Sequence, residues 1–250
     1  MSKDTDLLKI NQELREAIRA RDEFLAVAAH ELRSPMHALM LQVASAIALA
    51  RRDGSEDLLH RLERVRVVLD RYVKRATLLL DVSRINAGSM DLRFEELDIA
   101  EVLREVVEAY AIEATLHLIE IQLTAPDGLR GRWDRISIEQ IIGNLVSNAI
   151  KYGDGKPVRI CLEMEGARVR LEVKDEGIGI SAEDQARIFG RFEQVVTGQH
   201  RTGFGVGLWL ARALIEAHRG SISVRSAPGQ GTVFTVWLPL DATSAPVSGV

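Results

Sequence analysis

A histidine with a carboxylate beside it is the first group in this chain that could do chemistry. His30 lies in the segment FLAVAAHELRSP, residues 24–35, and Glu31 follows it directly. A neutral imidazole keeps one nitrogen lone pair for nucleophilic attack near pH 7, and an adjacent carboxylate can fix its tautomer. A lone histidine on a helix is more often a solvated surface residue, so both interpretations stay open at this point.

Two amides and an ammonium group form a second polar set. Asn144, Asn148 and Lys151 recur at helical spacing and therefore share one stripe of a predicted helix. Amide oxygens can ligate Mg²⁺, which also takes substrate phosphates, and a lysine one turn on can neutralise phosphate charge. Solvated polar residues on an exposed helix face give the same spacing.

Asp175 and two glycines form a third set, in the segment DEGIG directly after a predicted strand. A carboxylate at a strand end is a fixed acceptor that suits an exocyclic amine. Gly177 and Gly179 let the backbone approach a flat ligand or adopt positive φ, while Ile178 can still pack. An ordinary glycine turn is the alternative interpretation.

A second glycine segment, GFGVG, leads into a predicted helix. Its residues Gly203, Gly205 and Gly207 would present successive N–H groups at a helix N-terminus, an arrangement that binds phosphate. The segment lacks the GK[ST] of a Walker A loop and the GxGxxG spacing of a dinucleotide site. The polar residues 194–202 before it are expected to form a mobile lid.

The N-terminal third of the chain must position His30. Apolar residues at helical spacing predict helices over residues 6–51 and 58–87, joined by a polar turn at 51–57. Pro35 should bend the first helix just beyond His30. Because one hairpin buries only one side of each apolar stripe, we predict that residues 1–88 pair with a second copy in a homodimeric four-helix bundle.

The rest of the chain mixes strand and helix periods. Strands are predicted over residues 91–95, 120–123, 158–163, 168–173, 221–226 and 232–238, and helices over 99–116, 134–152 and 207–218. One more helix, containing Ile188 and Phe189, is predicted after a capping box of Ser181 and Asp184. From the helix at 134–152, Ile138, Ile142, Leu145 and Ala149 should face the sheet. Without strict βαβ alternation, this order predicts an α+β sandwich, a mixed sheet with helices on one face. The tail, residues 241–250, is predicted to be disordered.

Charge and cysteine content narrow the class of protein. The 250 residues carry a formal net charge of −4 at pH 7, which gives no electrostatic case for binding nucleic acid. The single cysteine, Cys161, cannot form an internal disulfide. It is expected to be a buried structural residue in a reducing compartment. No segment predicts a membrane span or a signal peptide.

Five further motifs follow the histidine-bearing hairpin in order. They are NLVSNAIKY (144–152), DEGIGI (175–180), IFGRFEQ (188–194), GFGVGL (203–208) and GQGTVFTV (229–236). With the hairpin they closely resemble the sensor histidine kinases of two-component signalling, over residues 20–240. The resemblance implies a signalling coiled-coil segment (1–23), a dimerisation and histidine phosphotransfer domain (24–88), a Bergerat-type ATP-binding domain (89–240) and a tail (241–250).

The resemblance also implies roles for single residues. His30 would be the phosphoacceptor, and Glu31 would orient its ring or take its proton. The implied ATP-binding residues are Asn144, Asn148, Lys151, Tyr152, Asp175, Gly177, Gly179, Arg191, Gly203, Gly205, Gly207 and Leu208. Of these, Asn148 and Asn144 would hold Mg²⁺, Asp175 would bind the adenine amine, and Arg191 would contact the γ-phosphate.

Three positions depart from the family's usual pattern. Ser34 stands where Thr or Asn is common, at the position linked to dephosphorylating the partner, so phosphatase activity is not implied. Phe204 lies between the glycines where a small or hydroxylated residue is common, and Trp209 stands where alanine is frequent. The resemblance also implies that Phe189 and Phe192 anchor the lid or its interface with the helices.

The implied function is autophosphorylation of His30 with Mg²⁺ and ATP, followed by phosphoryl transfer to an aspartate on the receiver domain of a separate response regulator. The expected location is the cytoplasm. A Bergerat-fold ATPase, or a pseudokinase scaffold that acts by binding, is the alternative. The stimulus, and whether phosphorylation runs within or between subunits, stay open from the sequence.

Overall fold

The computed structural model of the chain describes residues 39–66, 68–69, 72, 92–191, 193 and 205–243. The chain divides into two compact units, Met1–Asp91 and Leu92–Val250. The predictions for His30, Glu31, Ser34, Gly203 and the lid at 194–202 lie outside the described residues, as do those for Pro35, Phe192 and Phe204.

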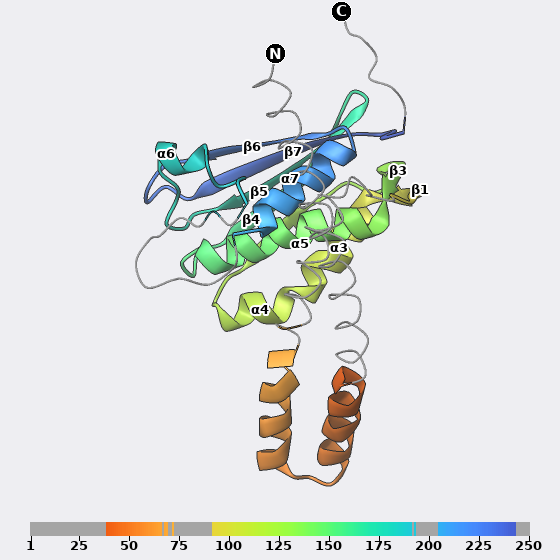
Figure 1. Cartoon of the computed structure of the whole chain (residues 1–250), viewed down its shortest axis with the longest axis vertical. Coiled ribbons are helices and arrows are strands. Elements are labelled where there is room, and N and C mark those ends of the chain that lie inside the picture. Colours follow the sequence, from red (N-terminus) through yellow and green to blue (C-terminus); the bar gives the residue numbers. More distant parts are fainter. Residues whose placement is uncertain are drawn as a thin grey trace, which may run out of the picture. The chain divides into compact units, whose positions relative to one another are not determined.

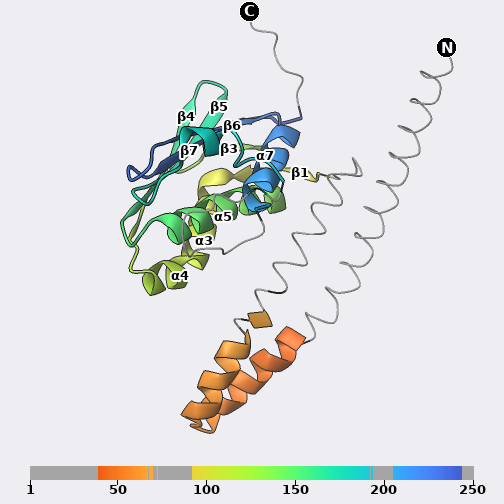
Figure 2. The same ribbon diagram turned by 60° about the vertical axis from the view of Figure 1, so that its left-hand side comes forward.

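The described part of the first unit is a helical hairpin (Figures 1 and 2). Residues 39–52 and 56–66 are helical, and the turn between them lies where the polar segment predicted it. Gly54 takes φ +67 in that turn, a conformation that glycine adopts at no steric cost. An ion pair of 3.2 Å joins Arg51 to Glu63 across the two helices.

Large apolar side chains of this hairpin stay exposed within the single chain. Leu41 is 73% exposed and Leu49 is 50% exposed, against 7% for Ile47, which packs between the helices. Others that are about half exposed are Leu39, Leu58, Val65, Val68 and Tyr72. The hairpin therefore buries only part of its apolar surface by itself.

The second unit is built on a five-stranded sheet in the order β2-β4-β5-β7-β6. Its strands are β2 (Ile121–Thr124), β4 (Val158–Glu165), β5 (Arg168–Asp175), β6 (Ser221–Ser226) and β7 (Thr232–Pro239). The β2–β4 pair is parallel and the other pairs are antiparallel. The helices α5 (Arg135–Tyr152) and α7 (Gly207–Ala217) lie side by side on one face (Figure 1). This mixed sheet with helices on one face confirms the predicted class.

The helix α5 begins and faces the sheet as its sequence predicts. Asp134 caps it by accepting a hydrogen bond from the Ser137 N–H at 2.8 Å, and it accepts a second from the Arg93 N–H at 2.8 Å. The predicted stripe is buried: Ile138, Ile142, Leu145 and Ala149. This helix is the support for the amide and lysine stripe.

A short strand was missed by the sequence prediction. Strand β3 (Arg130–Asp134) pairs antiparallel with β1 (Phe94–Asp98) in a separate two-stranded sheet. The segment RGRWD has no apolar alternation, because its one buried apolar side chain is Trp133, whose indole N–H donates to the Pro239 carbonyl at 2.8 Å. A contact 106 residues away in the sequence leaves no local periodicity to detect.

Two predicted helix boundaries were wrong. The helix over 99–116 divides at Tyr110 into α3 (Ile99–Ala109) and α4 (Ala111–Leu116). Ser181 does cap α6 (Ala182–Gln185) by accepting from the Asp184 N–H at 3.1 Å, but Ile188 and Phe189 lie beyond this one-turn helix.

The start of the predicted disordered tail is ordered. The Arg132 N–H donates to the Leu240 carbonyl at 2.7 Å, and the Ala242 N–H donates to the Arg132 carbonyl at 3.3 Å. Ala242 is only 2% exposed. Small residues gave no sequence signal for this contact, which fixes residues 241–243 against β3.

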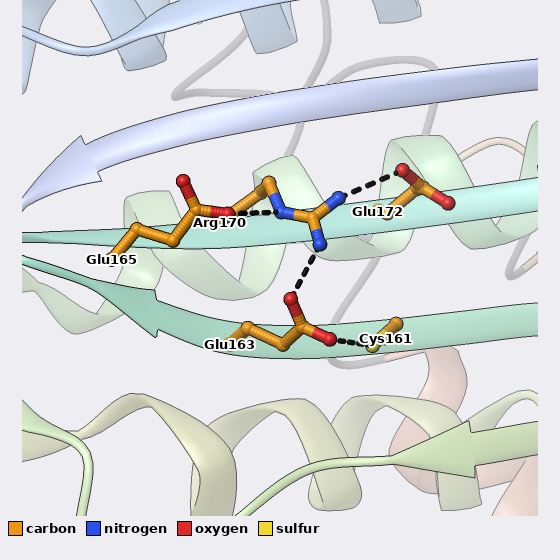
Figure 3. A network of polar contacts seen from close by, with 5 residues as sticks. All are labelled: Cys161, Glu163, Glu165, Arg170 and Glu172. Carbon is orange, nitrogen blue, oxygen red and sulfur yellow. Dashed lines mark hydrogen bonds and ion pairs between the residues drawn. The ribbon is translucent and has the colours of Figure 1, made fainter.

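Cys161 is not buried, contrary to the prediction. It lies half-exposed on the face of β4 away from the helices, and its thiol donates to Glu163 at 3.3 Å (Figure 3). Arg170 contacts Glu163 and lies 3.0 Å from both Glu165 and Glu172. Burial, and then the bond to Glu163, raises the pKa of the Cys161 thiol, so it remains a thiol rather than a reactive thiolate.

The end of α4 gives a stability prediction. Leu118 takes φ +57 and is 86% exposed, and the Ile119 N–H bonds to the Ala114 carbonyl at 2.9 Å, as in a Schellman motif. Leu118→Gly should raise the free energy of unfolding by about 0.5–1 kcal/mol, because glycine adopts this conformation without the Cβ penalty. Urea unfolding measures the change. Leu118→Ala keeps the penalty and should give no such gain; equal gains would contradict the explanation.

Candidate functional site

A buried carboxylate lies where β5 ends. Asp175 is 4% exposed, and its Oδ1 accepts hydrogen bonds from the Gly177 N–H at 2.9 Å and the Thr232 N–H at 3.2 Å. Burial raises the pKa of Asp175, and these two bonds oppose that rise. Within the described part of the chain no donor is paired with Oδ2. One oxygen is therefore fixed and the other can accept from a ligand.

Two glycines beside Asp175 let other backbone segments come close. A Cβ on Gly177 would lie 1.8 Å from the Tyr152 carbonyl oxygen, and one on Gly179, which takes φ +69, would lie 1.9 Å from the Ala227 carbonyl oxygen. The loop after β5 is thereby pressed between the end of α5 and the β6–β7 turn. The glycines that the sequence singled out are required here by close packing.

Polar side chains outside the predicted set hold this loop. The Ser226 hydroxyl accepts from the Ile180 N–H at 2.8 Å and donates to the Gly231 carbonyl at 2.7 Å. Gln185 donates to the Ile180 carbonyl at 3.0 Å and the Ser226 carbonyl at 2.8 Å. Thr232, which fixes Asp175, lay in the quoted GQGTVFTV motif, but Ser226 and Gln185 had no spacing signal.

The amide stripe meets the start of α7. A Cβ on Gly207 would lie 2.9 Å from the Asn144 Oδ1, so the first turn of α7 lies directly against this side chain. Asn148 is half-buried one turn further along α5. Lys151 donates to the Tyr152 hydroxyl at 2.7 Å, with its Nζ 4.5 Å from that ring's centroid. Amide oxygens, an ammonium group and a helix N-terminus are thus placed along one line.

The described residues on either side of 194–204 touch each other. A Cβ on Gly205, which takes φ +64, would lie 2.2 Å from the Glu193 carbonyl oxygen. Leu208 is half-buried in the first turn of α7. The Arg191 guanidinium lies over the Trp209 ring, 4.4 Å from its centroid. Arg191 and Gly205 therefore lie at the start of α7.

The far ends of α5 and α7 are joined by His218. This residue is fully buried; its Nδ1–H donates to the Leu214 carbonyl at 2.8 Å, so its Nε2 accepts from the Asp134 N–H, at 3.1 Å. The Phe94 ring lies edge-on at 5.3 Å. Both ring nitrogens are used only when the imidazole is neutral. Gly207 against Asn144 and His218 against Asp134 therefore fix the register of the two antiparallel helices.

The buried His218 predicts a pH-dependent stability. Burial lowers its pKa below the usual 6.5, although the Leu214 carbonyl and the Asp134 charge oppose this. The unfolded chain therefore binds more protons than the folded chain below pH 6.5. The stability that neutral His218 contributes is complete above pH 6.5 and is lost as the pH falls towards the pKa of the folded state. His218→Gln should reduce the slope of unfolding free energy against pH between 5 and 7 by up to about 1.4 kcal/mol per unit. Urea unfolding measures the slope; the exposed His117→Gln is the control, and an unchanged slope in His218→Gln would contradict the prediction.

The donor set suits a metal that arrives with phosphate. In residues 39–66, 92–191 and 205–243, no group of three or more His, Cys, Asp or Glu side chains could hold a metal ion by itself. Mg²⁺ keeps waters and takes phosphate oxygens, so it needs few protein ligands. The amide oxygens of Asn144 and Asn148 fit such a role.

The described helices include none with the length and apolar character that crossing a membrane requires.

The site consists of two parts on a compact domain: an acceptor for an amine at Asp175, and a helix N-terminus with amides and cations at Gly207. A nucleotide has the matching chemistry, with an amino-substituted base at one end and phosphates at the other.

Comparisons with known proteins agree with this geometry. A family model described as histidine kinase-, DNA gyrase B-, and HSP90-like ATPase matches residues 133–242. The sensor-like histidine kinase SenX3 of Mycobacterium tuberculosis is 34% identical over 223 residues, 88% of this chain and 54% of that protein. The alginate biosynthesis sensor protein KinB of Pseudomonas aeruginosa is 33% identical over 229 residues, 89% of this chain and 37% of that protein.

Solved structures give the same result. Full-length ShkA in complex with AMPPNP matches 90% of this chain and 47% of its own, with a TM-score of 0.68 and 27% identity. The catalytic domain of the histidine kinase ThkA matches 60% of this chain and 99% of its own, with a TM-score of 0.54 and 29% identity. The chain spans about half the length of SenX3. With the sheet, the glycine loops and these matches together, the second unit of the chain is a sensor histidine kinase ATP-binding domain.

Proposed function

We propose that this chain is the catalytic core of a sensor kinase that phosphorylates His30 with ATP and Mg²⁺, and then passes the phosphoryl group to an aspartate of a separate response regulator. The observation that carries the proposal is Asp175: its Oδ1 is held by two backbone N–H groups, which leaves Oδ2 to accept from the exocyclic amine of adenine. The related ShkA structure holds AMPPNP, an ATP analogue.

The phosphates would lie at the other end of the site. The N-terminus of α7 attracts negative charge, and Asn144 lies directly against it. Lys151 would exchange its bond to the Tyr152 hydroxyl for phosphate contact. Asn148 and Asn144 would hold Mg²⁺, which supplies charge neutralisation on the phosphate oxygens.

His30 would act as the nucleophile. One ring nitrogen of the neutral imidazole forms a bond to the γ-phosphorus while the bond from that phosphorus to the β,γ-bridging oxygen breaks, and ADP leaves with the electron pair. Glu31 would orient the ring through the other nitrogen and take its proton. Phosphoryl transfer needs mainly such positioning and charge neutralisation from a protein.

The first unit would supply the histidine as a dimer in the cytoplasm. The exposed apolar side chains of the described hairpin, such as Leu41 and Leu49, support pairing of residues 1–88 with a second copy. The proposed division is a signalling coiled coil at 1–23, a phosphotransfer domain at 24–88, an ATP-binding domain at 89–240 and a tail after it. Ser34 keeps a hydroxyl at the position linked to phosphatase activity.

Incubation of the whole chain with γ-labelled ATP and Mg²⁺ tests the proposal. The expected result is a protein-bound label that is labile to acid, stable to alkali, and lost in His30→Gln. The matched control is His60→Gln on the exposed face of the described hairpin, which should keep the label. ATP turnover with no protein-bound label would support an ATPase instead, and binding with neither turnover nor label would support a scaffold.

A further inference from the structure

We propose that Trp209 is a positioning residue that holds Arg191 beside the phosphate end of the nucleotide site. The inference rests on the proposed function and adds to it a residue whose role the family's pattern does not supply. Trp209 lies on α7, two residues after Gly207, and its ring carries the Arg191 guanidinium with the Cζ 4.4 Å from the centroid. This distance is well within the range of cation–π attraction.

The contacts around this pair place it at the phosphate end. Arg191 precedes Glu193 by two residues, and the Glu193 backbone lies against Gly205. Gly207, two residues further on, lies against the amide of Asn144. The guanidinium is therefore held next to the first turn of α7, where the phosphates of a nucleotide would lie.

The electrostatics of this arrangement point to an anion. A guanidinium beside a helix N-terminus is repelled by the helix dipole. The first turn of α7 has no acidic residue, and no carboxylate in the described part of the chain is paired with Arg191. Lys151 also has a hydroxyl and a ring as its partners instead of a carboxylate. Neither cation is therefore neutralised by a carboxylate within the described residues, although the chain as a whole carries a net charge of −4.

The aromatic ring holds the Arg191 guanidinium without using its N–H groups. A carboxylate at position 209 would bind Arg191 through the same N–H groups that must face phosphate, whereas an indole attracts it through the ring face and leaves the edge N–H groups free. Trp209 thus limits the rotamers of Arg191 before the nucleotide arrives. The gain should appear at the terminal phosphate, since Arg191 is expected to contact the γ-phosphate.

The test compares affinity for AMPPNP with affinity for ADP, both with Mg²⁺, in the full chain. Trp209→Leu should weaken AMPPNP binding about fivefold, the factor given by about 1 kcal/mol of lost cation–π attraction, and should change ADP binding less than about twofold. Trp209→Phe should restore most of the AMPPNP affinity. Arg191→Gln should produce the same selective loss, and adding Trp209→Leu to it should cost nothing more.

A matched control lies on the opposite face of the sheet. Trp237 also carries an arginine, Arg170, with the Cζ 5.9 Å from its ring centroid, but it is on strand β7 away from the helices. Trp237→Leu should leave both affinities unchanged. Equal loss of AMPPNP and ADP binding in Trp209→Leu, or additive losses in the double variant, would overturn the positioning role while leaving the kinase proposal intact. A wild-type chain that binds neither nucleotide would instead overturn the proposed function.

Discussion

Asp175→Asn should weaken ATP binding by about 100-fold or more while the domain stays folded. The asparagine carbonyl can still accept from the Gly177 and Thr232 N–H groups, which accounts for both bonds of the Asp175 Oδ1. Its amide N–H₂ would replace Oδ2 and face the adenine amine. Two donors would then face each other in place of a donor and an acceptor. Loss of one charged hydrogen bond with an unpaired donor left behind costs about 3 kcal/mol of binding free energy, which corresponds to the predicted loss of affinity of about 100-fold or more.

Two measurements make this prediction specific. Urea unfolding should give a free energy within about 1 kcal/mol of the wild type, because the backbone contacts are kept. The ratio of ATP affinity to GTP affinity should fall, since the new amide can donate to the carbonyl that guanine carries in place of the amine. Equal affinity for ATP in the variant and the wild type would remove Asp175 from the nucleotide site.

Gly179→Ala should lower the free energy of unfolding by more than about 3 kcal/mol. Gly179 takes φ +69, and its added Cβ would lie 1.9 Å from the Ala227 carbonyl oxygen, so a backbone segment must move. Gly166→Ala is the matched control: it takes φ +61 in the β4–β5 turn with no atom within 4 Å of the added Cβ. It should cost only the conformational term, about 1 kcal/mol.

Chemical denaturation of both variants provides the comparison. Both variants lose the same stability from a positive φ. The difference between their free energies of unfolding therefore measures the contact between the loop after β5 and the β6–β7 turn. If the two alanine variants lose the same stability, the close approach at Gly179 is not a constraint on the fold. Nucleotide affinity in Gly166→Ala should stay at the wild-type value.

The sequence predicted those elements whose signals are local. The helix α5 was placed by its cap at Asp134 and by an apolar stripe from Ile138 to Ala149, and both are seen. The β4–β5 hairpin followed from the strands predicted over residues 158–163 and 168–173. Asp175 with Gly177 was identified because a carboxylate at a strand end and a glycine two residues on are adjacent in the chain.

Other features depend on contacts between distant residues. Strand β3 is held by Trp133, whose indole N–H donates to the Pro239 carbonyl at the end of β7. Residues 241–243 are ordered because they bond to Arg132. Cys161 was predicted to be buried from its apolar neighbours, but alternation put it on the outer face, next to Glu163. Ser226 and Gln185 hold the loop after β5 through bonds that span 46 and 41 residues, so no spacing rule could find them.

The register of β5 against β7 has a consequence for the kinetics of folding. Asp175 pairs with Thr232, 57 residues later, whereas β4 and β5 are joined by a short turn. The hairpin can form early, but the proposed adenine acceptor is incomplete until the last strand, β7, has paired with β5. ATP therefore has nothing to recognise in a partly folded chain. ATP should leave the folding rate unchanged and slow unfolding, because it stabilises the folded domain and does not assist its formation.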